Sequence, residues 1–139
     1  MQIIGFNLSK ILAERAENFQ RSPINTNIEF INFEKEKIQF LKEAEGLKVS
    51  FKYSIIYGEQ EGKGKQAEVS FEGFIIVSAE KEEIKDIQKS WKKKKIPSKL
   101  QMFLYNFILK RCSLKAAILE EDMNIPAHIP IPQVKPKTD

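Results

Sequence analysis

The sequence has little of what most catalytic and metal sites require. It contains one cysteine, Cys112, and one histidine, His128, in 139 residues. A single cysteine excludes an internal disulfide, and a lone histidine without nearby thiols does not complete a zinc site. The histidine also lies between prolines, so no Ser/His/Asp or Cys/His arrangement is indicated. We therefore expect no metal, no cofactor and no enzyme activity, with the cysteine buried in a helix.

Long apolar runs are absent as well. The longest uninterrupted aliphatic and aromatic run, Phe74–Val77, is far shorter than the ~20 residues of a membrane-spanning helix. The first residues lack a basic region followed by an apolar stretch, so they do not predict a signal peptide. Together with the single cysteine, this favours a cytoplasmic protein.

The charged residues do not form an obvious site. Most carboxylates alternate with lysines, as in Glu34–Lys37, which is typical of a solvated face. The glycines of Gly58–Lys65 superficially resemble a phosphate-binding loop. However, Gln66 replaces the required Ser or Thr, and the segment joins two strands rather than a strand and a helix. We interpret it as a charged hairpin loop.

The apolar content is ordinary in amount but unusual in distribution. The chain is 42% hydrophobic and 30% charged, with a net charge of +4, and its length fits one domain that buries about 68% of its unfolded surface. Many of the 10 Phe fall in segments that are apolar on both faces. This predicts either oligomerisation or an apolar binding surface.

The first half of the chain is rich in strand signals. Residues 3–18 fit both a helix and a strand, and Gly5 and Asn7 favour the strand. A second strand, 28–41, changes phase between Phe30 and Phe33, which predicts a bulge.

Two further strands follow a turn predicted at 43–46. Residues 49–57 alternate most clearly between apolar and polar. The return strand, 67–77, carries Phe74 and Ile76 on its opposite face, so both of its faces are apolar there.

Two helices are predicted next. Ser78 can cap a short helix with Ile84, Ile87 and Trp91 on its apolar side, and Pro97 opens a long helix over 98–122, about 37 Å in length. The broad apolar stripe expected on the long helix consists of Leu100, Phe103, Leu104, Phe107, Ile108, Leu114, Ala117 and Ile118. The acidic run Glu120–Asp122 lies unfavourably at the negative end of that helix.

The C-terminal segment is a proline-rich tail that carries large aliphatic side chains. Ile125, Ile129, Ile131 and Val134 are interspersed with prolines, which keep the backbone extended, so we expect the tail to lie on a surface of this chain or of a partner. The sequence thus predicts a single α+β domain over 1–139: a four-stranded antiparallel sheet (1–79), a short and a long helix (80–123), and an extended tail (124–139).

One basic cluster offers a different interpretation. Trp91 is followed by Lys92, Lys93, Lys94 and Lys95, which could contact phosphates while the indole stacks on a base. This describes a small nucleic-acid-binding protein. We favour the alternative, in which the lysines match the negative end of a helix and Trp91 belongs to the core, because the strands lack an interleaved basic face.

The whole layout resembles the SecB-like chaperones. The resemblance spans about Ile4 to Val134 and is carried by diffuse marks: Glu68-Val69 with Gly73-Phe74 in the fourth strand, and the long helix leading into Asn124-Ile125-Pro126. It implies an ATP-independent holdase that binds non-native polypeptide in apolar grooves, and a homotetramer built as a dimer of dimers. The groove or interface residues that it implies are Phe51, Tyr53, Ile55, Phe74, Ile76, Leu104 and Ile108.

Departures from the family concern its partners. The bacterial export chaperone is acidic and docks a translocation motor, whereas this chain is basic around Lys92–Lys95. The family's Cys-Pro and Phe-Pro marks and its zinc-seeking tail are not recognisable. The resemblance therefore implies a divergent member of the family. Such a member would serve protein export, act as a general holdase, or bind one client such as an antitoxin.

Overall fold

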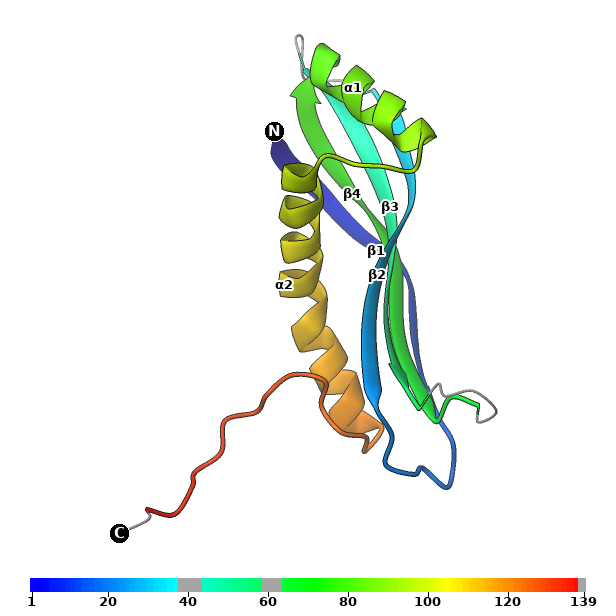
Figure 1. Ribbon diagram of the computed structural model, residues 1–139, viewed down its shortest axis with the longest axis vertical. Coiled ribbons are helices and arrows are strands. Elements are labelled where there is room, and N and C mark those ends of the chain that lie inside the picture. Colours follow the sequence, from blue (N-terminus) through cyan, green and yellow to red (C-terminus); the bar gives the residue numbers. More distant parts are fainter. Residues whose placement is uncertain (38–43, 59–63, 138–139) are drawn as a thin grey trace.

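One antiparallel sheet and two helices make up the fold (Figure 1). The computed structural model describes residues 1–37, 44–58 and 64–137. The elements are β1 (Gln2–Arg15), β2 (Ile24–Glu36), β3 (Ala44–Tyr57), β4 (Ala67–Glu80), α1 (Lys81–Lys92) and α2 (Ser98–Asp122). The predicted α+β class, with strands before helices, is confirmed.

The sheet has the order β1-β4-β3-β2, so β1 and β2 are its edges. The ambiguous segment 3–18 is a strand through Arg15, because β1 pairs along its length with β4, from Gln2 opposite Ser78 to Arg15 opposite Ala67. Those ladder hydrogen bonds outweigh the helical spacing of its apolar residues.

The bulge predicted in the second strand is confirmed. Phe30 lies opposite Phe51, and the register shifts before Asn32, which lies opposite Ser50. The extra residue is Ile31, whose side chain is exposed. The bulge lets Phe30 and Phe33 both join the core, with ring centroids 5.3 Å apart.

The turn predicted at 43–46 is wrong for its described part. Residues 44–46 continue β3 and pair with Ser78–Glu80, because the β3–β4 ladder extends beyond the apolar alternation that marked the strand. The predicted end of the second strand, 38–41, lies outside the described residues.

One face of the sheet is covered by the two helices (Figure 1). The alternation along β3 places every second side chain on this inner face: Leu47, Val49, Phe51, Tyr53, Ile55 and Tyr57 are at most 1% exposed. Burial of each such side chain contributes roughly 1.5–3 kcal/mol. The residues between them, such as Lys48 and Lys52, point to the outer face and are partly exposed.

The predicted cap of the first helix is wrong. β4 continues through Ser78 to Glu80, and α1 begins at Lys81 without a side-chain cap. The Ser78 hydroxyl instead donates to the Gln2 carbonyl, 3.4 Å away, across the β1–β4 pair. The buried side of α1, with Ile84 and Ile87, is as predicted.

The long helix α2 has the predicted bounds but a narrower buried side. Its buried residues recur at every fourth position: Leu100, Leu104, Ile108, Cys112, Ala116 and Glu120. Because a turn holds 3.6 residues, this line winds gradually around the helix. The prediction of one broad stripe is therefore wrong for Phe103, Leu114 and Ile118, which are 42%, 68% and 61% exposed.

Candidate functional site

The structure separates the seven sequence-predicted contact residues into two groups. Phe51, Tyr53, Ile55, Leu104 and Ile108 are at most 1% exposed and form the core between the sheet and α2. Phe74 and Ile76 are half-buried on the outer face of the sheet. The structure therefore does not bring the seven together in one groove, and their contact with a client stays a prediction.

The outer face of the sheet is mainly polar. A rung of alternating charge crosses all four strands, because Lys10 lies opposite Glu72, Glu72 opposite Lys52, and Lys52 opposite Glu29. Opposite charges that face each other across neighbouring strands attract, and this attraction stabilises the pairing of the strands.

The apolar part of the outer face lies beside that rung. Phe74 contacts the Lys48 ammonium, which is 4.5 Å from its ring centroid. Ile31, 49% exposed, lines the same shallow hollow as Phe74.

Two apolar patches lie on the exposed side of α2, and sequence reasoning missed their separation from the core. The N-terminal patch surrounds a hollow lined by Phe103, Leu100, Ile87, Pro97 and Met1. The C-terminal patch surrounds a hollow lined by Leu114, Ala117, Ile118, Ile125, Ala127 and Ile131. The exposed Asn106 and Lys110 interrupt the apolar sequence between the patches. The missed signal was that the apolar residues of this helix occupy more of its circumference than one sheet can cover.

A buried polar network fixes the root of the tail, which we define as residues 123–128. Nδ1 of His128 lies 2.7 Å from Oε1 of Glu120, and Nε2 lies 3.0 Å from the Tyr53 hydroxyl. The Tyr57 hydroxyl hydrogen-bonds to Glu120 Oε2 and to the Pro126 carbonyl. Burial, reinforced by Glu120, raises the pKa of Tyr57, so this phenol stays protonated as a donor.

The backbone of the tail root is held from a second direction. The Arg15 guanidinium of β1 donates to the carbonyls of Met123 and Asn124 at 2.9 and 2.8 Å. Asn124 adopts a left-handed conformation with φ 53°, which turns the chain back so that Ile125 is 7% exposed. These contacts satisfy carbonyls at the end of α2 that have no partner within the helix.

Beyond its root the tail leaves the body of the protein (Figure 1). Ile131 is 57% exposed and Val134 is fully exposed. The expectation that the tail lies on a surface therefore holds for its root on this chain's own body, whereas these two aliphatic side chains remain available to another surface.

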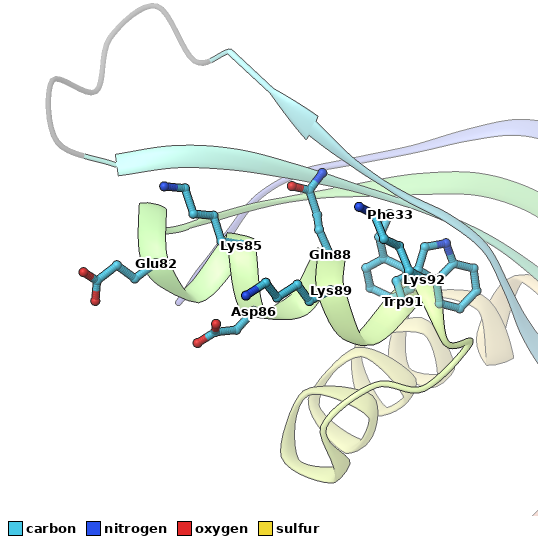
Figure 2. Close-up of a pocket in the computed structure, with 8 residues that line it drawn as sticks. All are labelled: Phe33, Glu82, Lys85, Asp86, Gln88, Lys89, Trp91 and Lys92. Carbon is cyan, nitrogen blue, oxygen red and sulfur yellow. The ribbon is translucent and has the colours of Figure 1, made fainter.

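The basic cluster begins at the end of α1, where Trp91 and Lys92 line a pocket (Figure 2). Lys92, Lys93, Lys94 and Lys95 are all exposed. The Trp91 ring already has two partners, since its centroid is 4.9 Å from that of Phe33 and 4.4 Å from the Lys94 ammonium. This pocket is lined by Lys85, Lys89 and Lys92 and also by the carboxylates Glu82 and Asp86, so its charge is mixed. An occupied indole and neighbouring carboxylates disfavour a site for stacked bases and phosphates.

The ionisable residues give no other chemical centre within the described ranges. No group of three or more histidine, cysteine or acidic side chains lies close enough there to bind a metal ion. Burial raises the pKa of the Cys112 thiol to about 11, so it is not an activated nucleophile at neutral pH. No helix in the described part is long and apolar enough to cross a membrane.

Comparison with known proteins gives one structural match to report. No family model matches the sequence, and no curated protein matches it significantly. The chain is similar to the solved structure of the Mycobacterium tuberculosis Rv1957 SecB-like chaperone in complex with a ChAD peptide from the Rv1956 HigA1 antitoxin. The match has 15% sequence identity and a TM-score of 0.47, and covers 98% of this chain and 92% of that chain. The name of that protein includes the family, SecB-like chaperones, that the sequence of this chain resembles.

Proposed function

We propose that this protein is an ATP-independent holdase, which binds extended apolar segments of non-native polypeptide and keeps them from aggregating. The observation that carries the proposal is the pair of apolar patches on the exposed side of α2. Met102, Phe103, Leu114 and Ile118 are between 42% and 68% exposed there. A cluster of exposed apolar side chains bordered by polar residues is the kind of surface that binds polypeptide.

The spacing of the patches suits an extended client. Fifteen residues of helix separate Phe103 from Ile118, a distance of roughly 22 Å. About seven residues of extended polypeptide span this distance. Alternate side chains of such a segment would fill the two hollows, and apolar burial at about 25 cal/mol per Å² would supply affinity before ordering costs.

Phe74 and Ile76 are proposed as a second, weaker contact on the outer face of the sheet. The five buried candidates, including Tyr53 and Leu104, act by shaping the sheet and the helix rather than by touching the client. This division follows from their exposure, because a side chain in the core makes no contact with a partner unless the fold opens.

A homotetramer, arranged as a dimer of dimers, is part of the same proposal. The edge strands β1 and β2 can pair between subunits, and some of the exposed surface of α2 would then lie at an interface. Several subunits acting on one client would raise its apparent affinity by avidity.

The proposed setting is the cytoplasm, where a holdase meets chains before they fold. The proposed client is either a precursor for export or one dedicated partner such as an antitoxin. Docking of a translocation motor through an acidic surface is not proposed, because the prominent charged cluster, Lys92–Lys95, is basic.

The experiment that tests the function is suppression of aggregation of chemically unfolded clients without nucleotide. The substrates are a general model client and an antitoxin peptide. We expect suppression at a near-stoichiometric ratio, persisting in moderate salt because apolar contacts depend little on ionic strength. Leu114→Ser combined with Ile118→Ser should reduce it severalfold.

The matched control is Lys110→Ser, at an exposed position of the same helix, which should keep full suppression. The oligomeric state of each variant is measured in parallel. If neither substrate is held by the native assembly, or if the double variant assembles normally and suppresses as well as the native protein, the proposal is overturned.

A further inference from the structure

The root of the tail is attached through a buried histidine, the side-chain type that most often changes its charge at physiological pH. His128 is inserted between α2 and β3 and contacts Glu120 on one side and Tyr53 on the other. The His128 and Glu120 side chains are 4% and 0% exposed. We call Tyr53, Tyr57, Glu120 and His128 the tail latch.

The cation that meets the Glu120 carboxylate in the latch is His128. Its Nδ1 lies 2.7 Å from Oε1 of Glu120, so His128 forms a salt bridge with this carboxylate when the imidazole is protonated. The other cation at the tail root, Arg15, is directed to the carbonyls of Met123 and Asn124. A buried carboxylate is strongly disfavoured without an opposite charge, and a protonated His128 would supply that charge at this distance.

The remaining titratable groups around the latch do not replace that charge. Tyr53 and Tyr57 approach from β3, and burial raises the pKa of both phenols, so they are neutral at physiological pH. Cys112 of α2 has a raised pKa and is neutral too. Arg111 and Lys115 lie on the exposed side of α2 beside Cys112.

We propose that the tail latch is a pH-sensitive device, which holds the tail root against the sheet while His128 is protonated and Glu120 is ionised. Loss of the His128 proton as pH rises removes the charge that Glu120 requires and weakens docking. Protonation of Glu120 in acid weakens docking from the other side. The tail root is therefore attached most firmly between these two titrations.

Opening of the latch would change the apolar surface that the protein presents. Ile125 and the rings of Tyr53 and Tyr57 are covered while the tail root is docked. Release would free the tail, take Ile125 and Ala127 out of the lining of the C-terminal patch, and open the end of the inner sheet face beside α2. That this surface receives a client rests on the proposed function, whereas the latch itself does not.

The test observes the histidine and the tail separately in the full chain. His128 is the only histidine, so its imidazole NMR signals report its protonation without assignment ambiguity. Hydrogen exchange of the Ile125 amide, which donates to the Glu120 carbonyl at 3.0 Å, reports docking of the tail root. Exchange rates are corrected for the intrinsic effect of pH.

We expect protection of the Ile125 amide to fall roughly fivefold to tenfold as His128 loses its proton. This factor corresponds to the difference in strength between a charged and a neutral hydrogen bond. His128→Gln should show weaker protection that no longer changes across this pH range. Constant protection in the native protein while His128 titrates overturns the proposal. So does an unchanged pH dependence in His128→Gln.

A second variant addresses the carboxylate. Glu120→Gln should loosen the tail root and abolish the same pH dependence, with core amides of β3 serving as the control for folding. If Glu120→Gln does not fold, the His128→Gln comparison still decides the question. That substitution removes the titrating side chain from the tail and leaves the sheet and α2 unchanged. Because these readouts involve no client, their failure is distinguishable from failure of the holdase activity.

Discussion

The Asn7 carbonyl oxygen on β1 lies only 2.2 Å from the position that a Cβ atom on Gly73 of β4 would occupy. The contact is with backbone, so a flexible side chain cannot move aside to relieve it. The β1–β4 register shifts close by, between Leu8 and Lys10. Gly73 is therefore the residue that lets the edge strand approach the sheet at this bulge.

Replacement of Gly73 by Ala should displace β1. We expect a loss of roughly 1–3 kcal/mol in the free energy of unfolding, measured by chemical denaturation. Gly64→Ala is the control, because a Cβ there meets nothing within 4 Å. Equal stability of the two variants would show that β1 adapts without cost.

Removal of Arg15 should loosen the end of α2. Arg15→Gln loses the charged donor to the Met123 and Asn124 carbonyls, which should cost about 1.5–3 kcal/mol. Thermal unfolding measures the loss, and hydrogen exchange at the Ile125 amide localises it. Arg21→Gln, at an exposed loop position, should change neither, and a similar effect of both variants would indicate a general charge effect.

Substitutions of Tyr53 and Phe74 should separate folding from binding. Tyr53→Ser removes a fully buried ring and should cost about 3–5 kcal/mol of stability. Phe74→Ser, on the outer face, should cost much less and should weaken client capture at normal assembly. The measurements are thermal unfolding and aggregation suppression. Unchanged capture by the assembled Phe74→Ser variant would remove this residue from the proposed site.

Neutralising the lysine run should leave client capture largely intact. Replacement of Lys92–Lys95 by Gln removes four exposed charges and none of the apolar surface. Capture of an uncharged apolar client is compared at low and moderate salt. A large loss of capture, together with steep salt dependence, would favour the charge-based nucleic-acid interpretation instead.

The buried thiol predicts a loss of stability in alkali. The pKa of Cys112 rises from 9.0 to about 11 in the folded protein, so between these values the unfolded chain releases its proton while the folded chain retains it. The contribution of the buried Cys112 thiol to the free energy of unfolding is fully present below pH 9. Above pH 9 it is lost at up to about 1.4 kcal/mol per pH unit.

Cys112→Ala should show a shallower decline of Tm between pH 9 and 11 than the native protein. Tyr57 contributes in the same direction at higher pH because its pKa is raised too, and it is present in both proteins. Parallel pH profiles for the two would contradict the assignment of this effect to Cys112.

Period and phase explain which parts of the fold could be predicted. The β3 alternation and the slip between Phe30 and Phe33 are local patterns, and both lead directly to the observed strand and bulge. The buried line on α2 depends on how the helix crosses the sheet, which no local pattern contains. Phe103 and Leu114 were therefore grouped with the core although they face outward.

The tail latch could not be predicted because it joins residues that no motif connects. Glu120 and His128 become neighbours through the reversal of the chain at Asn124, and Tyr53 arrives from a strand far earlier in the sequence. One signal was present in the sequence: an acidic run at the negative end of a helix is unfavourable unless a specific partner compensates it. For Glu120 that partner is His128.

The pairing of the first strand with the last has a consequence for how the chain is made. β1 leaves the ribosome before the other strands of the sheet, yet its hydrogen-bonding neighbour, β4, ends only at Glu80. Closing a loop of that length is slow because the chain loses conformational entropy before the contacts between the two strands can stabilise the pair. Until β4 has been made, β1 therefore lacks the strand with which it pairs, and its side chains Phe6 and Leu8 lack the core against which they pack.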